Sequence, residues 1–135
     1  MEQRLAAILA ADVVGYSKLM GADQLSSLAA LRKLRSELFM PSVARHGGET
    51  VKSMGDGWIV AFASVSDAVN CAIDIQNGVS AIPPIQLRMG VHLGDIVRED
   101  EDLFGDGVNI AARLEGAASP GDVLISDVVY HSLDG

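Results

Sequence analysis

The segment that most constrains this chain is residues 4–14, which are apolar almost without interruption and stop at Gly15. Such a run is typical of a central strand buried on both faces, although its periodicity alone also allows a helix. Asp12 lies inside the run, where an unpaired carboxylate would cost several kcal/mol in desolvation. Asp12 is therefore either a strand-end residue that has reached solvent or caps the next helix, or one half of a functional site.

Two patterns follow this strand. The first is a set of leucines at helical spacing, which predicts a helix that continues until Pro41 and the Gly47-Gly48 pair intervene. The leucines are Leu25, Leu28, Leu31, Leu34 and Leu38. The second consists of the strand-like runs 50–54 and 58–63, joined by the turn Gly55-Asp56-Gly57. This pattern predicts a hairpin with an acidic side chain at its tip.

The next segments complete a recognisable order of elements. Ser64, with Asp67 three residues later, resembles a capping box and predicts a helix that ends near Gly78. Residues 85–93 alternate between apolar and other side chains, which predicts a strand that ends at Gly94. The order so far is strand, helix, strand, strand, helix, strand. We therefore predict an α+β fold with a ferredoxin-like βαββαβ core and a mainly antiparallel sheet.

In that core the first and third strands are central neighbours, so Asp12 and Asp56 are expected to meet at one edge of the sheet. Two such carboxylates form a plausible pair for a divalent metal ion. An aspartate in a Gly-X-Gly turn is also common for conformational reasons alone. Beyond the core the sequence predicts a helix, a short strand and two helical turns, at residues 105–115, 123–125 and 127–133.

Composition narrows the class of protein. A chain of 135 residues fits a single domain, which we take to cover residues 1–135. Its net charge of −8 argues against broad binding to nucleic acid, because no basic stripe is present. The sequence shows neither an apolar run of about 18–20 residues nor a signal peptide, so we expect no membrane segment and a cytoplasmic location.

Three segments resemble the signature motifs of class III nucleotide cyclases, the adenylate and guanylate cyclases. They are residues 11–17, Ala-Asp-Val-Val-Gly-Tyr-Ser, residues 52–57, Lys-Ser-Met-Gly-Asp-Gly, and residues 102–113, Asp-Leu-Phe-Gly-Asp-Gly-Val-Asn-Ile-Ala-Ala-Arg. They occur in the family's order, and the resemblance extends over essentially the whole chain. It implies an adenylate cyclase that converts ATP into 3′,5′-cyclic AMP and pyrophosphate.

The resemblance assigns a role to each residue of the predicted site. Asp12, Asp56 and the carbonyl group of Val13 would hold two Mg²⁺ or Mn²⁺ ions. One ion lowers the pKa of the attacking ribose 3′-hydroxyl, and the other steadies the pyrophosphate leaving group. Asn109 and Arg113 lie four residues apart and so share a helix face. In this family they orient the ribose and neutralise charge on the α-phosphate.

Lys52 and Asp102 occupy the positions that read the purine in this family. The lysine donates to adenine N1 and the aspartate accepts from the exocyclic amine, a pairing that selects ATP. The family also implies a homodimer with two sites, each built from both chains. The metal-binding aspartates come from one subunit, and the purine and transition-state residues come from the other. The acceptance of ATP and the production of cyclic AMP imply a role in signal transduction.

The sequence departs from the family pattern in two places. Some members have an arginine that contacts the triphosphate where this chain has Asp95. Family domains also continue through a further C-terminal hairpin, so we expect the domain to be truncated there and its ATP binding to be weak. A downstream regulatory module is a further expectation from the family.

Two alternative functions stay open at this point. Gly47-Gly48-Glu49-Thr50 is similar to the motif of diguanylate cyclases, although that family carries it at the hairpin tip and here it precedes the strand. The other alternative is a non-catalytic cyclase-homology domain that binds nucleotide or dimerises. The presence of all six acting side chains argues against it. They are Asp12, Lys52, Asp56, Asp102, Asn109 and Arg113.

Overall fold

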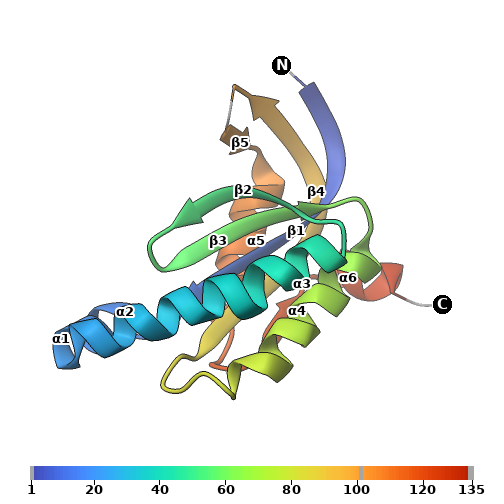
Figure 1. Cartoon of the computed structure of the whole chain (residues 1–135). Coiled ribbons are helices and arrows are strands. Elements are labelled where there is room, and N and C mark those ends of the chain that lie inside the picture. Colours follow the sequence, from blue (N-terminus) through green and yellow to red (C-terminus); the bar gives the residue numbers. More distant parts are fainter. Residues whose placement is uncertain (1, 101, 134–135) are drawn as a thin grey trace.

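The computed structural model describes residues 2–100 and 102–133, which form one six-stranded sheet with helices on both faces (Figure 1). The strands are β1 (Glu2–Val13), β2 (Glu49–Met54), β3 (Gly57–Phe62), β4 (Leu87–Glu99), β5 (Asp102–Phe104) and β6 (Val123–Ile125). The helices are α1 (Tyr16–Ala22), α2 (Gln24–Lys33), η1 (Leu34–Phe39), α3 (Met40–Arg45), α4 (Val65–Val79), α5 (Asp106–Ala117) and α6 (Asp127–Ser132). This order confirms the predicted α+β fold. None of these helices is long and apolar enough to cross a membrane.

Strand β1 lies in the middle of the sheet. The strand order is β2-β3-β1-β4-β5, and β6 pairs with β4 as the one parallel neighbour in the described part of the chain. The predicted contact between the first and third strands is confirmed by the β1–β3 ladder, in which Asp12 lies opposite Gly57. On its other side Asp12 lies opposite Arg88 of β4. The register therefore puts charged side chains at one end of the central strands.

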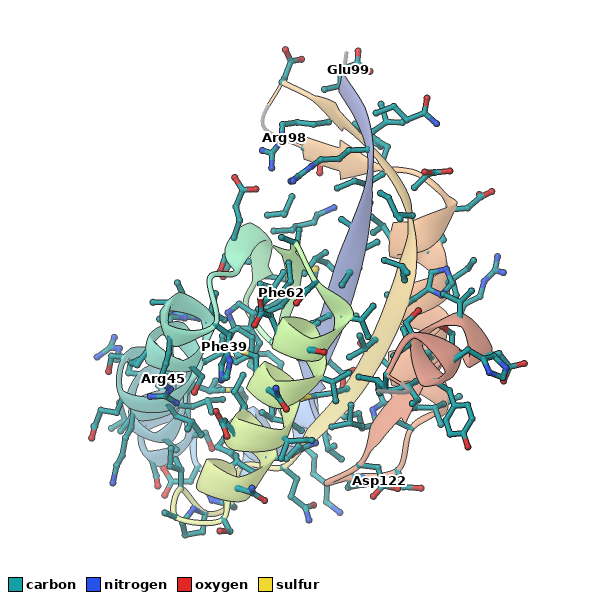
Figure 2. The ribbon with its side chains drawn as sticks, turned by 90° about the vertical axis from the view of Figure 1, so that its right-hand side faces the viewer. Phe39, Arg45, Phe62, Arg98, Glu99 and Asp122 are labelled. Atoms are coloured by element: carbon teal, nitrogen blue, oxygen red, sulfur yellow. The ribbon has the colours of Figure 1, made fainter. Side chains whose placement is uncertain are left out.

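The two faces of the sheet differ in their covering. On the face that we call the α4 face, α4 and the continuous helix of α2, η1 and α3 pack over the strands (Figure 1). Figure 2 labels Phe39 and Phe62, two of the large buried side chains of this core. The opposite face, the α5 face, is covered by α5. Its buried residues are Ala6, Ile8, Ala10, Ile59, Ile96 and Ala111.

Side chains alternate between these faces along each strand, and this alternation determines where Asp12 lies. In β1, Leu9 and Ala11 belong to the core of the α4 face, whereas Ile8 and Ala10 belong to that of the α5 face. Asp12 follows Ile8 and Ala10 at the same spacing. It therefore lies on the α5 face, outside the larger apolar core.

The sequence predicts that the first long helix is interrupted at Pro41, but the helix continues through α3 to Arg45 and ends just before the Gly47-Gly48 pair. The turn before the proline, η1, is π-helical, and the Met40 N–H donates to the Arg35 carbonyl five residues earlier. A wider turn accommodates the proline ring and its missing N–H, which would otherwise break an α-helix. Leu25, a member of the predicted apolar stripe, is 83% exposed and lies outside the core.

Strand β4 continues past Gly94, where the alternation predicts its end. Gly94 stays in the ladder opposite Ala6 of β1, so it does not end the strand. Glycine is needed in β4 because α5 packs directly on its backbone. A Cβ added at Gly94 would lie 3.2 Å from the Gly107 Cα, and one added at Gly90 would lie 2.5 Å from the Glu115 nitrogen. The glycines of β4 are positions of helix contact.

Candidate active site

Asp12 and Asp56, the two predicted metal-binding aspartates, lie next to each other. Asp56 is in the turn between β2 and β3, as predicted, and its backbone carbonyl accepts a hydrogen bond of 2.8 Å from the Val13 N–H. Asp12 lies opposite Gly57, the residue after Asp56. A Cβ at Gly57 would lie 3.0 Å from the Ala11 carbonyl oxygen, so the tip of the hairpin packs closely against β1. The structure thus joins Asp12, Val13 and Asp56 in one place.

Arg88 is a member of this site that sequence reasoning missed. Its Nε and Nη2 atoms donate to the two carboxylate oxygens of Asp12, at 3.1 and 2.6 Å, which is a bidentate ion pair. Its Nη1 atom donates to the Gly116 carbonyl at 3.2 Å. The hydrogen bond to Asp12 is the main cause that raises the pKa of the Arg88 guanidinium. An available signal was the alternation in β4, since Leu87 and Met89 point to the core and leave Arg88 on the other face.

Glu115, at the C-terminal end of α5, is a second residue that the sequence analysis did not single out. Its Oε2 lies 3.6 Å from the Arg88 Nη2, and its side chain is 15% exposed. Burial is the main cause that raises the pKa of its carboxyl group to about 7, and the negative charges of Asp12 and Asp56 act in the same direction. Arg88 acts in the opposite direction and lowers this pKa. The site therefore holds more acidic groups than its one arginine neutralises.

This donor set fits a divalent cation of the Mg²⁺ or Mn²⁺ type. Among the described residues, no three acidic, histidine or cysteine side chains gather closely enough to hold a metal ion by themselves. Magnesium is usually held by one or two carboxylates, with its remaining ligands from water or substrate phosphates. Asp12 and Asp56 supply two hard oxygen donors, and their negative charges, which add to the effect of burial on the pKa of Glu115, favour a bound cation.

Asn109 and Arg113 lie on the exposed side of α5, as their spacing predicts. The inward side of the same helix carries Ala111, which is fully buried. In the described part of the chain neither the Asn109 side chain nor the Arg113 side chain forms a hydrogen bond or an ion pair. They therefore share a face, but this chain does not join them to Asp12 or Asp56.

Lys52 and Asp102 come from the two ends of the strand order. Lys52 is exposed on β2 and lies opposite Ile59, which assigns it to the α5 face. Asp102 is half-buried at the start of β5. The sheet curls so that β2 and β5 approach each other. Arg98, which is labelled in Figure 2, lies on β4 next to β5 and donates a hydrogen bond to Glu49 of β2.

The motif that suggested a diguanylate cyclase lies away from the hairpin tip. Gly47 and Gly48 precede β2, and the tip contains Gly55 and Asp56. Gly48 instead serves packing, because a Cβ there would lie 2.6 Å from the Phe62 ring. The structure therefore gives this alternative no support.

Comparisons with known proteins agree with the fold. Residues 2–135 match the family described as adenylate and guanylate cyclase catalytic domain. The whole chain is 48% identical to the protein named "Putative adenylate cyclase 3" of Rhizobium meliloti (strain 1021), and it covers 24% of that protein. The chain thus spans about a quarter of the length of this curated relative.

Two solved structures extend the comparison. An adenylate/guanylate cyclase/hydrolase from Silicibacter pomeroyi is 43% identical, with a TM-score of 0.88 over 96% of this chain and 80% of that one. The catalytic core of a rhodopsin-guanylyl cyclase with converted specificity, solved in complex with ATPαS, is 25% identical. Its TM-score is 0.89, over 99% of this chain and 85% of that one.

Proposed function

This chain belongs to the family of adenylate and guanylate cyclase catalytic domains, and on that premise we propose that it converts ATP into 3′,5′-cyclic AMP and pyrophosphate. The observation that carries the proposal is the pair of Asp12 and Asp56. The hydrogen bond of 2.8 Å from the Val13 N–H to the Asp56 carbonyl joins the hairpin tip to the end of β1, where Asp12 lies opposite Gly57.

Asp12, Asp56 and the Val13 carbonyl would hold two Mg²⁺ or Mn²⁺ ions. Bound there, the ions supply Lewis-acid activation of the ribose 3′-hydroxyl and neutralise the polyphosphate. Arg88 contributes a further positive charge next to these carboxylates. Its planar guanidinium suits the oxygens of a triphosphate that is bound at the same place.

The exposed face of α5 supports a role in the transition state. Asn109 and Arg113 present an amide and a guanidinium to solvent, and in this chain nothing among the described residues competes for either group. The amide would orient the ribose, while the guanidinium would neutralise charge on the α-phosphate as the 3′-oxygen attacks.

Lys52 and Asp102 are the basis for proposing ATP as the substrate. Adenine offers an acceptor at N1 and a donor at its exocyclic amine, whereas guanine has the opposite pattern at these positions. A lysine and an aspartate match adenine. The approach of β2 and β5 is compatible with both residues addressing one base.

A homodimer would join the two groups of residues. Asp12 and Asp56 lie at the end of β1, whereas Asn109 and Arg113 point outward from α5, so a partner chain is the natural source of the second group. The chain also exposes large apolar side chains, Leu5 at 62% and Phe104 at 50%, on β1 and β5. A second chain with twofold symmetry would bury such a surface and complete two sites.

Regulation is a separate proposal. The chain covers 24% of its relative in Rhizobium meliloti, and a further module in the same protein would receive a signal and control the cyclase. The cyclic AMP product would then carry that signal onward.

The function is tested by incubating the purified protein with Mn²⁺ and either ATP or GTP, and by identifying the products by mass spectrometry. We expect cyclic AMP from ATP and little cyclic GMP. Mainly cyclic GMP would overturn the assignment of ATP. Bound nucleotide without any cyclic product would favour the non-catalytic alternative.

The two-chain site has its own test. Asp56→Asn and Arg113→Ala are each expected to abolish activity in a homodimer. Mixing the two inactive proteins produces heterodimers with one intact site, and random pairing should restore about a quarter of the wild-type rate. If the mixture stays inactive although the chains exchange, the site lies within one chain.

A further inference from the structure

Arg88 is hydrogen-bonded to the carboxylate of Asp12, which the proposed function assigns to a metal ion. Both oxygens of Asp12 accept from its guanidinium, at 3.1 and 2.6 Å. A divalent cation and a guanidinium repel each other, and the bidentate pair already uses one lone pair on each oxygen of Asp12. Charge repulsion therefore favours a metal-binding form of the site in which Arg88 has released at least one oxygen of Asp12.

A second acidic partner for Arg88 already lies next to the first. The same Nη2 atom that donates to Asp12 lies 3.6 Å from Oε2 of Glu115. The Nη1 atom holds the Gly116 carbonyl at 3.2 Å, which anchors the guanidinium at the end of α5. A small rotation about this anchor would transfer Nη2 from Asp12 to Glu115.

The close packing of α5 on β4 determines where the Glu115 backbone lies. Helix α5 packs so closely on β4 that a Cβ at Gly90 would lie 2.5 Å from the Glu115 nitrogen and 2.7 Å from the Ala111 carbonyl oxygen. The Glu115 side chain is the least exposed of the three charged groups, at 15% against 23% for Asp12 and 31% for Arg88. Glu115 is thus a less exposed acceptor beside a more exposed arginine.

We propose that Glu115 is a positioning residue of the cyclase site, which receives the Arg88 guanidinium when Asp12 binds a metal ion. This inference rests on the proposed metal-dependent function. Without Glu115, Arg88 would have only Asp12 as an acidic partner at this end of the described sheet, and it would compete more strongly with the metal. Glu115 thereby acts on metal affinity through Arg88, without contributing a ligand.

The test is a double-mutant cycle on Mn²⁺ affinity, measured by isothermal titration calorimetry and by electron paramagnetic resonance of free Mn²⁺. Glu115→Gln is expected to weaken Mn²⁺ binding about fivefold in the wild-type background. In an Arg88→Gln background the same change should have no effect, because the competing arginine is gone. Glu37→Gln, an exposed change of the same kind on η1, is the matched control and should leave affinity unchanged.

The outcomes separate the two proposals. Equal weakening by Glu115→Gln in both backgrounds would mean that Glu115 acts as a ligand or a general charge, and it would overturn the positioning role. No weakening in either background would overturn it as well. The metal site of the proposed function fails instead if the wild-type protein binds no Mn²⁺, or if Asp12→Asn leaves the binding of Mn²⁺ unchanged.

A measurement on the folded wild-type protein guards against variants that do not fold. The ¹⁵Nε–H resonance of Arg88 reports the hydrogen bond to Asp12 and is expected to shift when diamagnetic Mg²⁺ is added. In Glu115→Gln the shift should need about fivefold more Mg²⁺. A resonance that stays unchanged at saturating Mg²⁺ would show that Arg88 keeps Asp12, which would overturn the exchange of partners.

Discussion

The two faces of the sheet differ in the size and the charge of the side chains that they hold. The α4 face is covered by two long helical segments and buries large side chains such as Trp58, Phe39 and Phe62, with almost no polar groups. The α5 face is covered by α5, its buried residues are mainly alanine and isoleucine, and it keeps Asp12 and Arg88 beside its core. We conclude that the first face supplies most of the stability, and that the second gives up part of it to hold charge.

The largest expected effect tests the first half of this comparison. Trp58 is 1% exposed and stacks on Phe39 with ring centroids 4.4 Å apart. Trp58→Ala should lower the free energy of unfolding by about 3–5 kcal/mol, because it removes this stack and leaves a cavity. Urea denaturation followed by circular dichroism measures the change.

Trp58→Phe is the matched control for this prediction. It keeps the stacked ring and removes the indole N–H, which has no hydrogen-bond partner among the described residues. We expect a loss below about 1.5 kcal/mol. Similar losses for both variants would mean that the indole itself, and not the filled volume, stabilises this face.

The next effect tests the second half of the comparison. Asp56→Asn should lower the rate of cyclic AMP formation by about 100- to 1000-fold, the scale of removing one electrostatic contact to a transition state. The metal-free protein should be as stable as the wild type or slightly more so, since one of three neighbouring acidic groups is neutralised. A large loss of stability would show that Asp56 is structural.

Gly90→Ala should have an intermediate effect, because it pushes α5 away from β4. The added Cβ would lie 2.5 Å from the Glu115 nitrogen and 2.7 Å from the Ala111 carbonyl oxygen. We expect a loss of about 1–3 kcal/mol by urea denaturation. Gly116→Ala is the control, since a Cβ there meets nothing within 4 Å and should stabilise the helix by about 0.5–1 kcal/mol.

A smaller effect concerns substrate choice on the α5 face. Lys52 is exposed on β2, so Lys52→Ala should change stability by less than about 0.5 kcal/mol. The ratio of kcat/KM for ATP to that for GTP is expected to fall about tenfold or more, because one adenine contact is lost. Lys33→Ala, an exposed lysine of α2, is the control and should leave the ratio unchanged.

The smallest effect uses pH to compare two buried acids. On the α4 face, burial is the main cause that raises the pKa of the Cys71 thiol from 9.0 to about 12, and burial is also the main cause for Glu115 on the α5 face; in both cases a neighbouring carboxylate adds to the shift. The thiol has a lower pKa in the unfolded chain than in the folded protein, so ionisation at high pH favours unfolding. The stability that the neutral thiol allows is fully present below pH 9 and is lost as the pH rises toward 12.

Wild-type protein is therefore expected to lose about 1 kcal/mol more stability than Cys71→Ala between pH 8 and pH 10. Urea denaturation at both pH values measures the difference. Parallel losses in the two proteins would show that Cys71 is more accessible than its full burial indicates.

The sequence predicts the local features well where one segment decides them. The apolar run places β1, the Gly-Asp-Gly turn places Asp56 at the hairpin tip, and Ser64 caps α4 by accepting from the Asp67 N–H at 3.1 Å. It does not predict α1, whose N-cap residue is Gly15. This glycine has a left-handed backbone conformation and offers no side chain to cap the helix. The sequence also predicts that β4 ends at Gly94, whereas the strand continues. A glycine that lets a helix pack closely on a strand cannot be told from a glycine that ends a strand by sequence alone.

By itself, then, the sequence determined the order of the βαββαβ core, the family and a set of candidate site residues, because motifs and periodicity are properties of short segments. The candidates are Asp12, Val13, Lys52, Asp56, Asp102, Asn109 and Arg113. Only the tertiary structure decided which charges meet. The pair of Asp12 and Arg88 joins residues 76 positions apart, through a register that no local pattern encodes. Glu115 joins them because α5 packs on the glycines of β4, a contact that depends on the folded backbone.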